Sequence, residues 1–150
     1  MARQQQFEIR PYKGVGPVDF GDDVDAILAK LGPPDKILRS KRYKYPSNGF
    51  FVDIGSDGTV EAVELFDTDR ASVYGISLAG PVSDVLRRLE SHGHHCRRDD
   101  DDEDSIRCDD LGVILGESAE PEVMESVLAY RRGYWDTSGG HFFVGGRSVG

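Results

Sequence analysis

Residues 18–31 read VDFGDDVDAILAKL, and residues 76–89 read ISLAGPVSDVLRRL. Aligned at an offset of 58, both stretches carry four apolar residues at spacing i, i+3, i+4, i+7, which places them on one face of a helix. The matched positions are Val18, Phe20, Val24, Ile27, Leu28 and Leu31 in the first stretch and Ile76, Leu78, Val82, Val85, Leu86 and Leu89 in the second. This agreement predicts a tandem repeat, although two short amphipathic helices can also resemble each other by chance.

Each apolar quartet lies between residues that commonly begin and end helices. The first helix is expected to begin at Gly21-Asp22-Asp23, because carboxylates favour the positive end of a helix. It is expected to end at Gly32, which two prolines follow. The second helix is expected to begin at Pro81 and to end near His92-Gly93. Helices this short are marginal alone in water, so each needs a sheet to pack against.

Strand patterns follow both helices. They cover Lys41–Tyr45, Phe50–Ile54 and Thr59–Phe66 after the first helix, and Ser105–Cys108, Leu111–Leu115 and Val123–Tyr130 after the second. The turn Ser56-Asp57-Gly58 favours a hairpin, and Phe7 and Ile9 indicate one further strand. We therefore predict an α+β fold made of two tandem helix-then-antiparallel-strand units. The helices are expected to pack on one face of the sheet, with the opposite face at least partly open.

Residues 14–35, GVGPVDFGDDVDAILAKLGPPD, resemble the opening motif of the beta-lactamase inhibitor protein (BLIP) fold, which also includes the SmpA and OmlA small lipoproteins of outer-membrane assembly. The shared pattern is an apolar-glycine lead-in, the striped helix and a Leu-Gly-x-Pro end, here Leu31-Gly32-Pro33-Pro34. An aromatic strand usually follows, and Arg42-Tyr43-Lys44-Tyr45 fits it. The second unit keeps the lead-in and the stripe but ends as Leu89-Glu90-Ser91-His92-Gly93, without the proline.

The resemblance implies two BLIP-like units, at residues 7–70 and 71–136, before a glycine-rich C-terminal tail at 137–150. It also implies a non-catalytic protein-binding module of the inhibitor or immunity type. The chain departs from the secreted members because it shows no export signal and no cysteine pair within a unit. The shared motif is structural, so it assigns no binding residue.

The composition favours a soluble protein with a basic protein partner. The chain has 150 residues and a formal net charge of -9, which disfavours binding to duplex nucleic acid. No apolar run is long enough to cross a membrane, and the first residues lack the apolar core of a signal peptide, so a cytoplasmic location is expected. Two cysteines, Cys96 and Cys108, are too few for a disulfide framework and fit a reducing compartment.

A basic segment with interleaved tyrosines, residues 36–45, is the first candidate binding site. Tyrosine and arginine are favoured at protein interfaces, and aromatic residues between cations also suit nucleic-acid binding. We expect the exposed partner contacts to be Tyr43, Tyr45, Phe51, Trp135 and Arg42. The alternative interpretation is an edge strand that its charges protect from aggregation.

A cluster of metal-ligand residue types, His92, His94, His95 and Cys96, supports an alternative function as a metal or small-ligand sensor. The alternative interpretation is a polar loop that closes the second helix, with histidines near its negative end. The acidic run at residues 99–104 lacks the alternating ligands and glycine of an EF-hand, and such runs are usually solvated. No nucleophile, base and orienting group stand at meaningful spacing, so neither an enzyme nor a cofactor is expected.

Overall fold

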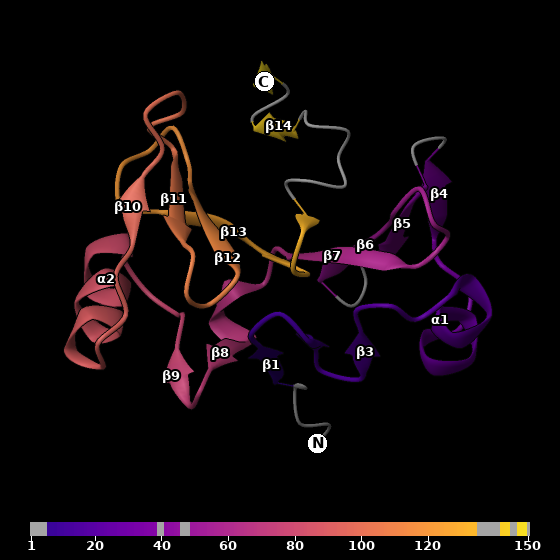
Figure 1. Cartoon of the computed structure of the whole chain (residues 1–150). Helices are drawn as coiled ribbons and strands as arrows, with labels where there is room; N and C mark the ends of the chain where they lie inside the picture. The colour runs from indigo at the N-terminus through magenta and orange to yellow at the C-terminus, as the bar shows by residue number, and fades with distance from the viewer. Residues whose placement is uncertain (1–5, 39–40, 46–48, 135–141, 145–146, 150) are drawn as a thin grey trace.

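Two sheets form the body of the molecule, and two short helices lie at its opposite ends (Figure 1). The structure is a computed structural model that describes residues 6–38, 41–45, 49–134, 142–144 and 147–149. The larger sheet has eight strands in the order β10 (Arg97–Arg98), β11 (Ser105–Cys108), β12 (Val113–Glu117), β13 (Met124–Tyr130), β7 (Val60–Leu65), β6 (Phe50–Ile54), β5 (Arg42–Tyr45) and β4 (Lys36–Leu38).

The smaller sheet has five strands, and it lies under the middle of the larger one (Figure 1). Its order is β3 (Val18–Asp19), β2 (Gly14–Val15), β1 (Phe7–Arg10), β8 (Ala71–Val73) and β9 (Ile76–Ser77). The remaining elements are α1 (Val24–Leu31), α2 (Val82–Ser91), the 3-10 turn η2 (Thr68–Arg70), and the paired strands β14 (Phe142–Val144) and β15 (Arg147–Val149).

The predicted α+β fold, with two helix-then-strand units and helices packed on one face of the sheet, is wrong. The described residues are mostly β, with thirteen strands in the two large sheets and only two short α-helices. The apolar residues before each helix form short hairpin strands, β3 and β9, which belong to the five-stranded sheet. That sheet, and not the helices, covers the middle of the larger sheet, so the helices pack at the ends of the core.

The helix boundaries and the longer strands agree with the sequence-based expectations. The side chain of Asp23 caps α1 by accepting a hydrogen bond from the Ala26 N–H at 2.9 Å. Gly32 ends this helix with a φ of 79°, a conformation that glycine adopts without strain. α2 begins at Val82, one residue after the expected start, and Pro81 is its N-cap in an extended conformation. The strands over Phe50–Ile54 and Ser105–Cys108 have the predicted bounds.

The two halves of the chain contribute strands to the eight-stranded sheet in mirrored order. β4 to β7 fill one side, β10 to β13 fill the other, and β7 pairs with β13 antiparallel in the centre. Both halves also carry a register shift between the fourth and fifth residue of a corresponding strand, after Asp53 in β6 and after Gly116 in β12. The domain bounds at residues 7–70, 71–136 and 137–150 stay a prediction, but the halves share one continuous sheet.

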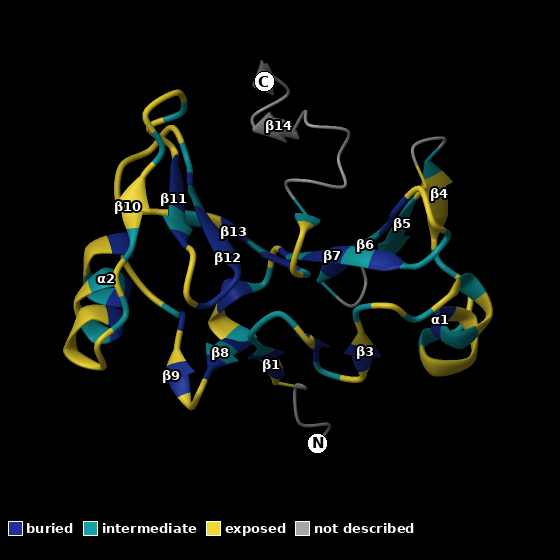
Figure 2. Cartoon of the chain, viewed as in Figure 1, coloured by how far each residue is buried: buried dark blue, intermediate teal, exposed yellow. Residues whose placement is uncertain are grey.

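The main hydrophobic core lies between the two sheets and extends to both helices (Figure 2). β1, β2 and β8 supply buried apolar residues from below, and the inward side chains of β5 to β7 and β11 to β13 supply them from above. At its ends, Ile27 of α1 and Leu89 of α2 are fully buried. Among the described residues, neither helix is long and apolar enough to span a membrane.

Candidate protein-binding face

The candidate site is the face of the eight-stranded sheet that points away from the five-stranded sheet, called here the outer face. Alternation along the strands decides which side chains reach it. In β6, for example, Phe50 and Val52 are buried in the main core, so Phe51 and Asp53 point outward. The outer residues are Arg42, Lys44, Phe51, Asp53, Ala62, Glu64, Arg107, Ile114, Leu128 and Tyr130, most of them half-buried.

An ion-pair cluster on the outer face joins three neighbouring strands. The guanidinium of Arg42 in β5 donates to Asp53 in β6 at 2.7 and 3.3 Å and to Glu64 in β7. Burial raises the pKa of Asp53, against the opposing effect of the Arg42 charge. Burial also works against the charged form of Arg42, but the hydrogen bonds and charges of both carboxylates outweigh it and raise the pKa of the guanidinium. The cluster therefore holds the side chains of Arg42, Asp53 and Glu64 in fixed positions on the outer face.

Two phenylalanines lie beside this cluster. The rings of Phe51 and Phe66 meet edge to face with centroids 4.6 Å apart, and Phe66 is 39% exposed. The Arg42 guanidinium and the Lys44 ammonium lie over the Phe51 ring, at 5.0 and 4.9 Å from its centroid. A partly exposed aromatic pair with cations at its side is a composition that protein interfaces favour.

A second apolar cluster occupies the centre of the outer face. Tyr130, Ala62 and Ile114 are buried there, and Tyr12, Leu128 and Tyr134 pack against them. Tyr12 arrives from the turn after β1, and its hydroxyl donates to the Asp109 carbonyl. Its ring lies against Gly112, where an added Cβ would come within 3.0 Å of it. Burial raises the pKa of the Tyr134 hydroxyl. This second apolar cluster is thus formed by residues of the eight-stranded sheet together with Tyr12, which is distant from them in sequence.

The predicted partner contacts fall on both sides of the sheet. Arg42 and Phe51 lie on the outer face, as the preceding contacts show. Tyr45 was expected to be exposed, but it is 2% exposed in the main core and its hydroxyl donates to the Gly32 carbonyl at 3.0 Å. Tyr43 is half-buried and packs against the same core. Trp135 lies outside the described residues. Of the four predicted contacts that the structure describes, it therefore brings Arg42 and Phe51 together on the outer face.

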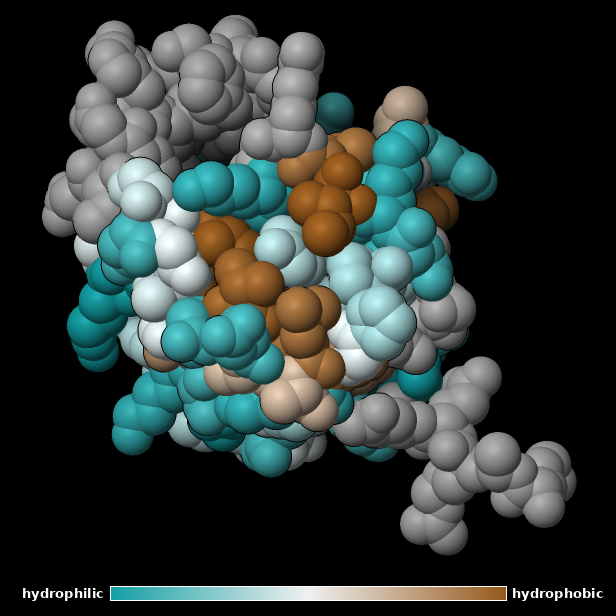
Figure 3. Space-filling model, turned by 90° about the vertical axis from the view of Figure 1, so that its right-hand side faces the viewer, coloured by the Kyte–Doolittle hydropathy of each residue, from teal (hydrophilic) through white to brown (hydrophobic). Residues whose placement is uncertain are grey.

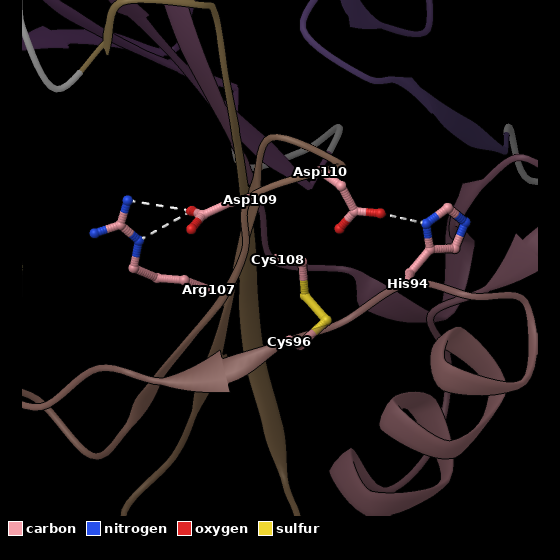
Figure 4. The surroundings of a disulfide bond; sticks show 6 residues. All are labelled: His94, Cys96, Arg107, Cys108, Asp109 and Asp110. Atoms are coloured by element: carbon pink, nitrogen blue, oxygen red, sulfur yellow. Dashed lines mark hydrogen bonds and ion pairs between the residues drawn. A yellow bond between two sulfur atoms is a disulfide. The ribbon is translucent and has the colours of Figure 1, made fainter.

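The four predicted metal ligands do not converge. Nδ1–H of His92 donates back to the Arg88 carbonyl at 2.9 Å, and His95 is exposed. His94 turns toward Asp110, 2.5 Å from its Nδ1 atom, and away from the neighbouring cysteine (Figure 4). In the parts of the chain that the structure describes, no group of three or more potential ligand side chains could hold a metal ion. The metal hypothesis receives no support from this geometry.

Cys96 forms a disulfide with Cys108 on β11 (Figure 4). The expectation that no cysteine pair lies within a unit is therefore wrong, because both cysteines lie in the second expected unit, residues 71–136. The bond ties the segment after α2 to the eight-stranded sheet across 12 residues of sequence. In this state the sulfur of Cys96 is not a thiolate and cannot bind a metal ion as one.

Sequence reasoning missed several members of the outer face. Glu64 and Phe66 could have been found, because they alternate with buried Val63 and Leu65 along a predicted strand. Tyr12 could not, since no local pattern connects a turn near the N-terminus to the far side of a sheet. Comparison of the chain with protein-family models, curated proteins and solved structures found no match. The resemblance to the BLIP fold stays a prediction.

Proposed function

We propose that the protein is a non-catalytic binding protein of the inhibitor or immunity type, and that it binds its protein partner with the outer face. The observation that carries this proposal is the Phe51–Phe66 pair, half exposed and flanked by Arg42 and Lys44. Rigid aromatic side chains bury much area at little entropic cost, which is why they dominate binding energy at interfaces. The ion pairs to Asp53 and Glu64 hold Arg42 in position before a partner arrives.

The proposed partner is a basic protein. The cations Arg42 and Lys44 are matched locally by Asp53 and Glu64, so they add no net charge at the aromatic pair. The net charge of -9 then sets the long-range field, which accelerates association with a positively charged partner. Association should accordingly slow as ionic strength rises.

The compartment is open to a direct measurement. A cytoplasmic location was expected, whereas the disulfide between Cys96 and Cys108 favours an oxidising compartment. Thiol titration of denatured protein taken rapidly from its native source distinguishes them. Two free thiols would support the cytoplasmic location, and none would support an oxidising compartment.

Site-specific photo-crosslinking in native cells tests the proposed function. A photoreactive phenylalanine analogue replaces Phe66, and the control variant carries it at Tyr74, which is also exposed but lies between β8 and β9 of the five-stranded sheet, away from the outer face. We expect a discrete adduct with one protein from position 66 only, which unlabelled wild-type protein competes away. No competed adduct at position 66, or the same adduct from both positions, would refute the proposal.

The partner identified in this way permits a quantitative test. Phe66→Ser should weaken binding by at least about 2 kcal/mol, which is the level expected of a central aromatic contact. Tyr74→Ser should change the affinity by less than about 0.5 kcal/mol, because Tyr74 lies on the five-stranded sheet, outside the proposed interface. Isothermal titration calorimetry measures both values, and equal effects of the two variants would contradict the assignment of this face.

A further inference from the structure

A pocket of about 200 Å3 lies between α1 and the two sheets, on the inner side of the larger sheet. Its walls are Phe7, Val15 and Val18 from the five-stranded sheet and Phe50 and Val63 from the eight-stranded sheet, all buried. Its remaining lining residues are Pro17, Lys30 and Leu31, which are all at least partly exposed and therefore form its mouth. The buried side chains that line the pocket are thus apolar, and the pocket reaches solvent beside one lysine.

The pocket exists because α1 packs less closely than its counterpart α2. In α2, Val82, Val85 and Leu89 are all fully buried. In α1 only Ile27 is, while Leu28 is 39% exposed. Figure 3 shows an apolar area between hydrophilic ones on this end of the molecule, which carries α1 and β4. The first half of the chain therefore leaves unfilled the space that the second helix fills with its side chains.

The lysine at the mouth has hydrogen-bonding capacity to spare. The ammonium of Lys30 donates to Asp22 at 2.6 Å and to Asp19 at 3.2 Å, and Asp19 also pairs with Arg10. An ammonium has three N–H donors, so within the described residues one of them has no protein partner. The two carboxylates and two cations in this ion-pair network balance in charge, so the network offers an anion no net positive charge.

We propose that this pocket binds a small uncharged apolar molecule, with one ring or a short acyl chain, whose terminal carbonyl or hydroxyl oxygen accepts a hydrogen bond from Lys30. A cavity of comparable volume with apolar side chains in its walls is large enough to bind a molecule of the size of benzene. Burial of the apolar part removes its surface from water, and Lys30 orients the polar end at the mouth. This site is separate from the outer face, and the proposal does not depend on the proposed function.

Three probes of similar size separate the parts of this proposal: acetophenone, ethylbenzene and benzoate. Amide NMR titration of the full chain is expected to show shifts around α1, β2 and β7, with acetophenone binding more tightly than the other two. Lys30→Met should weaken acetophenone binding about tenfold, the effect of one hydrogen bond to a charged donor, and should leave ethylbenzene binding unchanged. The matched control is Lys36→Met on β4, which is exposed and does not line the pocket.

A filling substitution tests the cavity without a ligand. Val63 and Val127 lie on the two central strands, where they pair with Ala129 and Leu65 respectively, but only Val63 lines the pocket. Val63→Phe should keep the melting temperature and abolish binding of all three probes, whereas Val127→Phe should lower the melting temperature through overpacking.

The proposal would be overturned by three results. The first is that a probe still binds Val63→Phe. The second is that benzoate binds more tightly than acetophenone. The third is that Lys30→Met and Lys36→Met change the affinity for acetophenone equally. If Val63→Phe itself unfolds the protein, Val18→Leu replaces it, because Val18 also lines the pocket and adds less volume. Its expected result is weakened binding of all three probes, and unchanged binding would count against the site.

Discussion

Arg42 supports two carboxylates, Asp53 and Glu64, on the outer face. All three side chains are less than one third exposed, so water screens the charges incompletely. Removing the guanidinium leaves Asp53 half-buried without its cation, in a place where burial already raises the pKa of that carboxyl. Replacing one member of such a cluster should therefore cost far more than replacing a surface charge.

Arg42→Met is predicted to lower the free energy of unfolding by about 2 kcal/mol at pH 7, measured by urea denaturation. The matched control is Arg87→Met, since the Arg87–Asp84 pair is 70% and 46% exposed. It should cost less than about 0.5 kcal/mol. If the two variants had the same free energy of unfolding, the ion pairs of Arg42 would contribute no more to stability than an exposed surface pair.

Asp57 predicts a pH dependence at the turn between β6 and β7. Its carboxylate accepts hydrogen bonds from the hydroxyl and the backbone N–H of Thr59, at 2.8 and 3.0 Å, and from Arg131. These bonds lower the pKa of Asp57 from 3.8 to about 2. Since the folded-state pKa is below the unfolded value, the ionised carboxylate stabilises the fold above about pH 4, and this stabilisation is lost as the pH falls toward 2.

The measurement is the melting temperature of wild-type protein and Asp57→Asn between pH 5 and pH 2. The advantage of the wild type should shrink steadily as the pH falls, because only its carboxylate becomes protonated. Thr59→Val removes the hydroxyl donor but keeps the backbone donor. That variant should show a smaller change with pH than the wild type. A wild-type advantage that stays constant down to pH 2 would contradict the assignment.

At the scale of the elements, the spacing of apolar residues predicted the helices and the longer strands, but it did not predict the shortest strands. The helical stripes and strands of four or more residues carry enough period to locate them. The strands β2, β3 and β9 have two residues each, and two residues have no period. Their apolar residues, such as Val18 and Ile76, were therefore interpreted as the segment that leads into each helix and not as strands. The second sheet, and with it the correct fold class, was lost for this reason.

The candidate site was partly predictable by the same argument. In Arg42-Tyr43-Lys44-Tyr45, alternation puts the two tyrosines on one face and the two cations on the other. The tyrosines took the core because they bury more apolar area, which leaves Arg42 on the outer face with Phe51. The pairing of Phe51 with Phe66, by contrast, depends on the register of β6 and β7, which composition does not reveal.

The unequal packing of the helices gives a prediction at the same scale. Leu31 and Leu89 are the last apolar positions of the two matched stripes, but Leu89 is fully buried and Leu31 is partly exposed beside the pocket. Leu89→Ala should lower the free energy of unfolding by about 3 kcal/mol, because it leaves a cavity. Leu31→Ala should cost about 1 kcal/mol. Equal losses in chemical denaturation would show that α1 packs as tightly as α2.

At the scale of the whole molecule, the strand register relates the two halves of the large sheet. Glu64 of β7 pairs with Leu128 of β13 at the centre, and on either side the pairs are Leu65 with Val127 and Val63 with Ala129. The mirrored strand order and the two corresponding register shifts follow the same relation, while the tandem repeat itself stays a prediction. The two halves nevertheless differ at α1, where only the first has space for the proposed small molecule.

A shared sheet and a shared core predict that the two halves unfold together. One hydrophobic cluster contains buried residues of both halves, including Ile27 of the first and Leu115 of the second. Calorimetry should therefore show a single transition whose calorimetric and van't Hoff enthalpies agree. Ile27→Ala and Leu115→Ala, at about 3 kcal/mol each, should both shift this whole transition to lower temperature. Two transitions, with each variant moving only one of them, would instead support independent domains at residues 7–70 and 71–136.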